Sequence, residues 1–159
     1  MTRTRSEYRL SPIPTEPATT HPLAFGHPNE SRREELAVLL LDAYRNTIDD
    51  EGEDLDDARE AIDTYLAIIQ TSHSFVVVDG DRPVAFSFVV IVDGVHYIDP
   101  VVVRSDRKRE GLGRVAVRLC LDSLAGADVT VVGATVTDGN IASERLFASL
   151  GFTCHGVWA

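Results

Sequence analysis

The segment of this chain best suited to binding a ligand is 103–113, with the sequence VRSDRKREGLG. It leads from an expected strand into an expected helix, and residues 104–114 carry five basic side chains against two acidic ones, although the chain's net charge is −10. Gly111 and Gly113 lack a Cβ atom, so a ligand can approach their backbone closely. A helix N-terminus adds unpaired N–H groups and the positive end of the helix dipole. The segment therefore predicts a phosphate-binding loop.

Hydrophobic periodicity predicts the elements that position this loop. Apolar residues at helical spacing indicate helices from Ser31, as N-cap, to Ala43 and over 58–69. Period-two runs and an Asp93-Gly94 turn then indicate an antiparallel meander of three strands. After the loop come a helix, a strand, a helix and a short strand, giving a mixed α/β class. The expected ranges outside the first two helices are 75–78, 84–92, 95–103, 112–119, 129–136, 141–150 and 152–158.

Prolines mark two further features. Residues 1–30 hold five of the seven prolines and predict an irregular N-terminal arm with a short strand at 8–13, followed by one domain over 31–159. Pro100 lies within the third strand of the meander, where a proline cannot donate to a strand ladder. We therefore expect a bulge near 99–101, with backbone groups left free to bind a ligand. An unpaired edge strand explains Pro100 alone equally well.

Composition limits the class of protein. With 159 residues, 44% hydrophobic and 25% charged, the chain predicts one globular domain, and it contains neither a secretory signal pattern nor a long apolar run. Cys120 and Cys154 form neither a metal-ligand spacing nor a disulfide framework, so we expect a cytoplasmic protein without a bound metal. The charge of −10 argues against nucleic acid as a partner, and no membrane partner is expected.

Two motifs in this element order resemble the GNAT superfamily of acyl-CoA-dependent N-acetyltransferases. The first is Lys108-x-x-Gly111-x-Gly113, similar to R/Q-x-x-G-x-G/A. The second is Asn140-x-x-Ser143-x-x-Leu146-Phe147-x-x-x-Gly151-Phe152, similar to N-x-x-A-x-x-L-Y-x-x-x-G-F. The resemblance covers roughly 31–158. It implies a mostly antiparallel sheet flanked by helices, with a splayed central strand and a glycine loop at a helix N-terminus. It also implies another strand after Phe152, where only seven residues remain.

The resemblance further implies acetyl-CoA as co-substrate. The loop amides would bind the pyrophosphate, the splayed strand would pair with the pantetheine, and an N–H near Val103 would hydrogen-bond the thioester carbonyl. The second motif would flank the pantetheine and sulfur. The residues expected to hold acetyl-CoA are Val101, Val102, Val103, Lys108, Arg109, Glu110, Gly111, Leu112, Gly113, Arg114, Asn140, Ser143 and Phe147.

The implied reaction is direct attack of a primary amine on the thioester. Phe147 replaces the tyrosine that in many family members protonates the leaving thiolate, and a thiol pKa of about 8.5 still lets CoA leave unassisted. Asp99 is the expected base and Tyr97 a substitute acid. Tyr44 and Glu53, the latter in an acidic run over 49–57, would face the acceptor.

The acceptor class remains open between an amine-bearing small molecule and a protein amino group, and a homodimer is one of the options. The alternative function is an acyl-CoA-binding regulatory module with little or no turnover, which Phe147 favours. The missing final strand leaves three alternatives: a truncated sheet, a sheet completed by a second chain, or a short one.

Overall fold

The computed structural model describes residues 3–16 and 23–158. Their strands form one sheet in the order β2-β3-β4-β5-β6-β1-β7. The strands are β1 (Arg5–Leu10), β2 (Ala24–Gly26), β3 (Phe75–Asp79), β4 (Arg82–Val92), β5 (Val95–Val103), β6 (Val132–Thr137) and β7 (Thr153–Val157). The α-helices are α1 (Arg33–Tyr44), α2 (Leu55–Ile68), α3 (Leu112–Gly126) and α4 (Ile141–Ser149), with 3-10 turns at Glu30–Arg32, Thr71–His73 and Ser105–Arg107.

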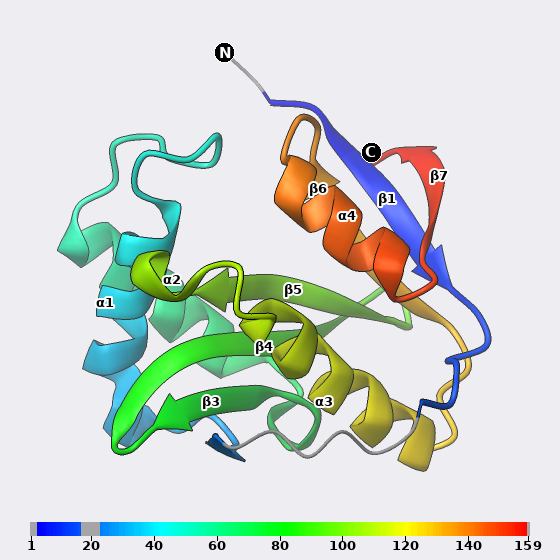
Figure 1. Cartoon of the computed structure of the whole chain (residues 1–159), viewed down its shortest axis with the longest axis horizontal. Coiled ribbons are helices and arrows are strands. Elements are labelled where there is room, and N and C mark those ends of the chain that lie inside the picture. The colour runs from blue at the N-terminus through cyan, green and yellow to red at the C-terminus, as the bar shows by residue number, and fades with distance from the viewer. Residues whose placement is uncertain (1–2, 17–22, 159) are drawn as a thin grey trace.

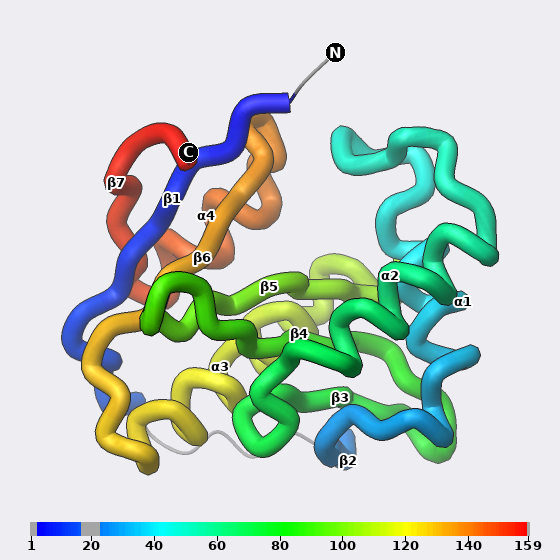
Figure 2. The backbone as a smooth tube through the Cα atoms, turned by 180° about the vertical axis from the view of Figure 1, so that it is seen from behind, coloured from blue at the N-terminus to red at the C-terminus, as the bar shows by residue number. Residues whose placement is uncertain are grey.

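Helices cover both faces of the sheet. Figure 1 shows α3 and α4 on the near face, where Val117, Leu121 and Phe147 pack into one core cluster. Figure 2 shows α1 and α2 on the opposite face, where Leu36 and Ile62 pack against β4 in a second cluster. None of the helices in the described ranges is long and apolar enough to cross a membrane.

The meander confirms the strands predicted from period-two patterning. β3, β4 and β5 pair antiparallel in sequence order, and Asp93 and Gly94 turn the chain with φ of 50° and 79°. Ser87 pairs with Val101, and Val89 pairs with Ile98. One residue of β4 therefore faces two of β5, Asp99 and Pro100. The expected bulge lies at these two residues.

The sheet divides between β5 and β6, its one parallel pair in the described residues. These strands pair only from His96 to Ile98, with Val132 to Ala134, and then diverge. Beyond the bulge, the edge of β5 that faces β6 is therefore without a strand partner. The mixed, mostly antiparallel sheet with a splayed central strand is as expected, and the split is where the main cavity opens.

The N-terminal segment contributes more to the sheet than an irregular arm would. The strand expected over 8–13 lies at Arg5–Leu10, and β1 is antiparallel to both β6 and β7. In this sheet β7 is paired with β1 of the same chain, so a second chain is not needed to hold that strand. Residues 1–2, 17–22 and 159 lie outside the described residues, and the boundary at residue 30 stays a prediction.

Two helix starts differ from expectation. Ser31 does not cap α1: it lies in the preceding 3-10 turn, and its hydroxyl bonds to Asn29. The capping box that the structure does contain begins α2, where Asp54 and Asp57 each accept a hydrogen bond from the other's backbone N–H. These two carboxylates therefore have a structural role within the acidic run.

Candidate active site

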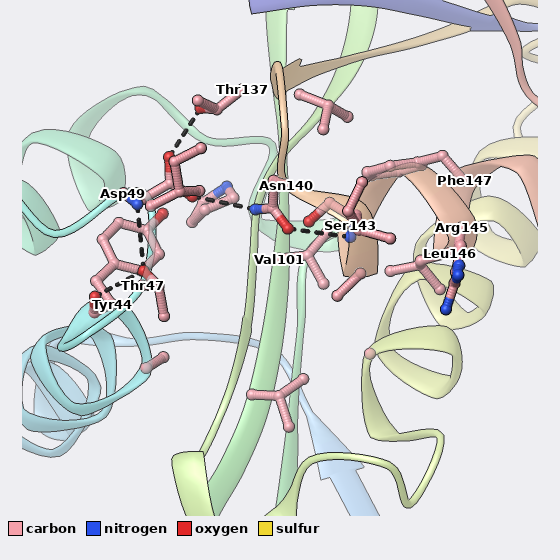
Figure 3. A pocket seen from close by; sticks show the side chains of 18 of the residues that line it. Tyr44, Thr47, Asp49, Val101, Thr137, Asn140, Ser143, Arg145, Leu146 and Phe147 are labelled. Carbon is pink, nitrogen blue, oxygen red and sulfur yellow. Dashed lines mark hydrogen bonds between the residues drawn. The ribbon is translucent and has the colours of Figure 1, made fainter. Parts of the chain in front are cut away.

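A cavity of about 1050 Å³ opens where β5 and β6 diverge. Its walls are the C-terminal end of α1, the loop 45–54 between α1 and α2, β5 beyond the bulge, the start of α3, and the junction of β6 with α4. Figure 3 shows Tyr44 and Asp49 on one side of this cavity and Asn140, Ser143 and Phe147 on the other. The cavity thus brings together the two motifs singled out in the sequence.

The glycine loop forms one end of the cavity and has the properties of an anion site. Gly111 is the N-cap of α3 at φ 76°, a conformation that favours glycine, and Arg109 has φ 72°. None of the backbone N–H groups of 108–114 donates to a residue in the described parts of the chain. A Cβ at Gly113 would lie 3.4 Å from Val103 and 3.5 Å from Leu146. The loop therefore presents free donors at a helix N-terminus beside a narrow wall.

The basic side chains of this loop are only partly available. Arg104 pairs with Asp106, Arg107 pairs with Asp79 and Glu110, and Arg114 pairs with Glu16, each at 2.8 Å. Lys108 reaches back to the carbonyl of Ala43 at 3.4 Å, and Arg109 is exposed on the cavity wall. The positive field at the loop thus comes mainly from Lys108, Arg109 and the helix dipole.

Val101, Val103 and the first turns of α4 form the middle of the cavity. Asn140 is the N-cap of α4, with Oδ1 accepting from the Ser143 N–H at 3.2 Å. Phe147 is buried and packs edge-on against Phe152, with ring centroids 5.0 Å apart. It lines the cavity with an apolar ring that has no proton to donate.

Asp99 lies on the bulge at the other end of the cavity. Its Oδ1 accepts a hydrogen bond from the Tyr65 hydroxyl at 3.4 Å. Burial raises the pKa of Asp99, and the positive charge of Arg5 and this hydrogen bond partly oppose that rise. Burial, together with the charge of Asp99, also raises the pKa of Tyr44 and of Tyr65. Asp99 is therefore a carboxylate with an increased affinity for a proton.

Three of the predicted site residues do not line the cavity. The Tyr97 hydroxyl bonds to Glu7 and to Arg9, and its ring packs against Trp158. Val102 is 1% exposed and packs in the cluster beneath α1 and α2, because strand side chains alternate. Glu110 is engaged by Arg107. The other predicted binding and acceptor residues, Tyr44 and Glu53 included, line the cavity.

Sequence analysis missed two contributors, Asp49 and β1. Asp49 accepts from Thr137 Oγ1 at 2.8 Å and from Asn140 Nδ2 at 3.1 Å, which joins loop 45–54 to the far wall (Figure 3). Arg3 and Arg5 reach the cavity from the N-terminal segment. No local signal separates Asp49 from its acidic neighbours, and the arm was expected to lie outside the domain. Among the described residues, no group of three or more His, Cys, Asp or Glu side chains is placed to hold a metal ion.

Comparisons with known proteins agree with this geometry. The sequence model of the acetyltransferase (GNAT) family matches residues 33–152. A GCN5-related N-acetyltransferase from Sphaerobacter thermophilus has a similar structure, with a TM-score of 0.73 and 13% identity over 98% of this chain and 49% of that one. This chain therefore spans about half the length of that protein. No curated protein sequence matched.

Two further solved structures share the fold. The ribosomal-protein-S18-alanine N-acetyltransferase from Escherichia coli has a TM-score of 0.66 and 18% identity, over 82% of this chain and 77% of that one. AAC(6')-Iy, in complex with the bisubstrate analogue CoA-S-monomethyl-acetylneamine, has a TM-score of 0.63 and 14% identity, over 84% and 92%. The family match covers most of the chain and confirms the resemblance carried by the two motifs. This chain belongs to the acetyltransferase (GNAT) family.

Proposed function

We propose that this chain transfers the acetyl group of acetyl-CoA to a primary amine by direct attack in a ternary complex. One observation carries the proposal: a single cavity joins the free N–H groups of the glycine loop to the half-buried carboxylate of Asp99. The first suits a pyrophosphate, and the second suits an amine that must lose a proton. The two ends are the binding sites that a two-substrate transfer requires.

The residues at the glycine loop fit CoA. Free amides of 108–114, the exposed Arg109 and the open backbone at Gly111 would hold the pyrophosphate, while Val101, Val103 and Ser143 would flank the pantetheine. The CoA-containing analogue bound by AAC(6')-Iy supports the same assignment. A thioester bound along this wall would place its acetyl group towards Asp99.

The proposed reaction requires the protein to accept one proton. The amine nitrogen forms a bond to the thioester carbon, the C–S bond breaks, and CoA leaves as a thiolate. The proton lost by the amine goes to Asp99, whose raised pKa makes it a better acceptor than an ordinary aspartate. Phe147 supplies no proton to the sulfur, so the thiolate is protonated by solvent.

The acceptor is an amine on a small molecule or on a protein, with Tyr44 and Glu53 facing it from α1 and loop 45–54. We further propose a cytoplasmic location, because Cys120 and Cys154 are both free thiols.

Acetyl-CoA-dependent thiol release with a panel of primary amines tests this function. We expect steady release above hydrolysis for at least one amine, together with stabilisation of the fold by acetyl-CoA. The alternative, a CoA-binding module with little turnover, rests on the apolar Phe147. It predicts stabilisation without release across the panel, both in the wild type and in Phe147→Tyr. Absence of any acetyl-CoA binding would contradict both functions.

A further inference from the structure

The acceptor end of the cavity contains charges of both signs. Asp99 and the carboxylates of loop 45–54 lie on the side of α1 and β5, whereas Arg3 and Arg5 reach the same cavity from the N-terminal segment. A site for a simple cationic amine would need only the carboxylates. Recognition of a simple cationic amine therefore does not explain why two arginines line this end of the cavity.

Most of these charged groups are already engaged within the chain. Asp49 holds Thr137 and Asn140, Glu53 accepts from the N–H of Glu51 at 2.9 Å, and Arg3 donates to the carbonyl of Asp50 at 3.0 Å. Arg5 differs. Its guanidinium makes no hydrogen bond or ion pair with a residue in the described ranges 3–16 and 23–158.

The other charged side chains on the face of β1 that carries Arg5 are paired with each other. Arg5, Glu7 and Arg9 share one face of the strand. Glu7 and Arg9 pair with each other at 2.7 Å and with the Tyr97 hydroxyl, which leaves Arg5 as the unpaired charge at the end nearest Thr137, its partner in β6. Of these three side chains, Arg5 is the one that lines the cavity.

Asp99, which lines the same cavity, has a free carboxylate oxygen. Only its Oδ1 accepts a hydrogen bond from a described residue, so Oδ2 is available to a ligand. No Arg5 nitrogen lies within 4.0 Å of an Asp99 carboxylate oxygen. A cation and an anion thus line one cavity without pairing, and a ligand with both charges fits between them.

We propose that the acceptor is an amino acid, a small molecule whose primary amine is accompanied by a carboxylate, and that Arg5 binds this carboxylate while the amine faces Asp99. The inference rests on the function proposed above. A guanidinium binds a carboxylate through two parallel N–H donors, which would fix the molecule's orientation as well as its affinity. An amine without an anionic group would leave Arg5 unpaired and would be repelled by its charge.

The test compares amines that differ only in the carboxylate. Each free amino acid is assayed beside its carboxamide and its decarboxylated amine, with acetyl-CoA as donor and thiol release as readout. We expect the preferred acceptor to be a free amino acid, with kcat/KM about tenfold or more above its amide and its amine.

Substitution of Arg5 then assigns the selectivity to that residue. Arg5→Gln should raise KM for the amino acid about tenfold or more, leave KM for acetyl-CoA unchanged, and leave or lower KM for the decarboxylated amine. Arg5→Lys should restore part of the loss. Arg9→Gln is the matched control, because it removes the same charge from the same strand face outside the cavity.

A binding measurement that does not depend on turnover tests this inference separately from the proposed function. The same compounds are added with CoA, and the unfolding temperature is measured for the wild type and for Arg5→Gln. A carboxylate-dependent stabilisation that Arg5→Gln removes supports the inference even if no thiol is released, in which case only the catalytic proposal fails. Equal acetylation and equal stabilisation with and without the carboxylate would overturn the role of Arg5.

Discussion

Asp49 and Asn140 lie 91 positions apart in the sequence, and their side chains are hydrogen-bonded at 3.1 Å. The bond links loop 45–54 to the N-cap of α4 across the cavity, and Thr47 Oγ1 helps to hold Asp49 by accepting its N–H at 3.2 Å. Asn140 thus bonds to the loop through its nitrogen and to the backbone of α4 through its oxygen. The loop and the cap of α4 are therefore one connected unit.

Replacing Asp49 should loosen this unit. Asp49→Ala removes the acceptor for Thr137 and Asn140, at a cost of about 1 kcal/mol for each hydrogen bond. We expect a lower unfolding temperature, faster amide exchange in loop 45–54, and KM for the acceptor raised several-fold. Asp56→Ala is the control, because Asp56 belongs to the same acidic run but is absent from the cavity wall. Equal exchange rates in the two variants would show that the loop is held by other contacts.

Gly113→Asp should prevent binding of acetyl-CoA. The new carboxylate would stand between Val103 and Leu146 at the first turn of α3, where it would fill the space beside the free amides and repel a pyrophosphate. Acetyl-CoA at one hundred times its dissociation constant stabilises a protein by about 2.7 kcal/mol, and this shift in unfolding temperature should disappear. Gly126→Asp makes the same charge change at the other end of α3 and should retain the shift.

Asp99→Asn should stabilise the protein and inactivate it. Because the pKa of Asp99 is raised by burial, the unfolded chain ionises first, and the folded state loses stability as pH rises from about 4 through the folded pKa. The gain in unfolding temperature of the variant should therefore be absent near pH 4 and complete above the folded pKa. Asp128→Asn, at an exposed position, makes the same chemical change and is the control.

The same substitution should also change the pH dependence of the reaction. If Asp99 is the base, the acidic limb of kcat/KM in the wild type lies above the range of an ordinary aspartate, and Asp99→Asn lowers kcat/KM and removes this limb. A variant that keeps the wild-type limb would assign proton removal to another group.

Glu16→Gln should strengthen the binding of acetyl-CoA. Glu16 pairs with Arg114 at 2.8 Å, and Arg114 lines the cavity in the first turn of α3. Release of Arg114 makes its charge available to a phosphate, but exposed pairs contribute at most about 1 kcal/mol, so we expect KM for acetyl-CoA to fall by up to about fivefold. Asp122→Asn, which removes the ion pair of Arg118 one turn further along, is the control. An unchanged KM in both would mean that Arg114 does not contact the ligand.

Local sequence patterns predicted those parts of the fold that are determined by residues close together in the sequence. The period-two runs of β4 and β5, the Asp93-Gly94 turn and the bulge at Pro100 follow from the conformations of neighbouring residues. The cavity residues of the glycine loop and of α4 were found because their motifs are contiguous. Asp54 was missed as a cap because its partner is Asp57 and not the usual Glu or Gln.

What could not be predicted depends on pairing between distant segments. Nothing within 5–10 indicates that this strand pairs with β6 and β7. Similarly, nothing in the acidic run distinguishes Asp49, which reaches Thr137, from Asp50, which bonds within its own loop. Tyr97 was expected at the site because it alternates onto the face of Asp99, but Glu7 and Arg9 of β1 bind its hydroxyl.

The position of β1 also sets the order in which the sheet can be completed during synthesis. β1 precedes the other described strands in the sequence, and its partners β6 and β7 follow all of them, so its backbone donors and acceptors stay unpaired until residues 132–157 have been synthesised. The meander of β3, β4 and β5 can form long before. The cavity lies at the boundary between this early half of the sheet and the half that forms later, and the cavity wall that carries Arg5 is therefore completed only after β6 has been synthesised.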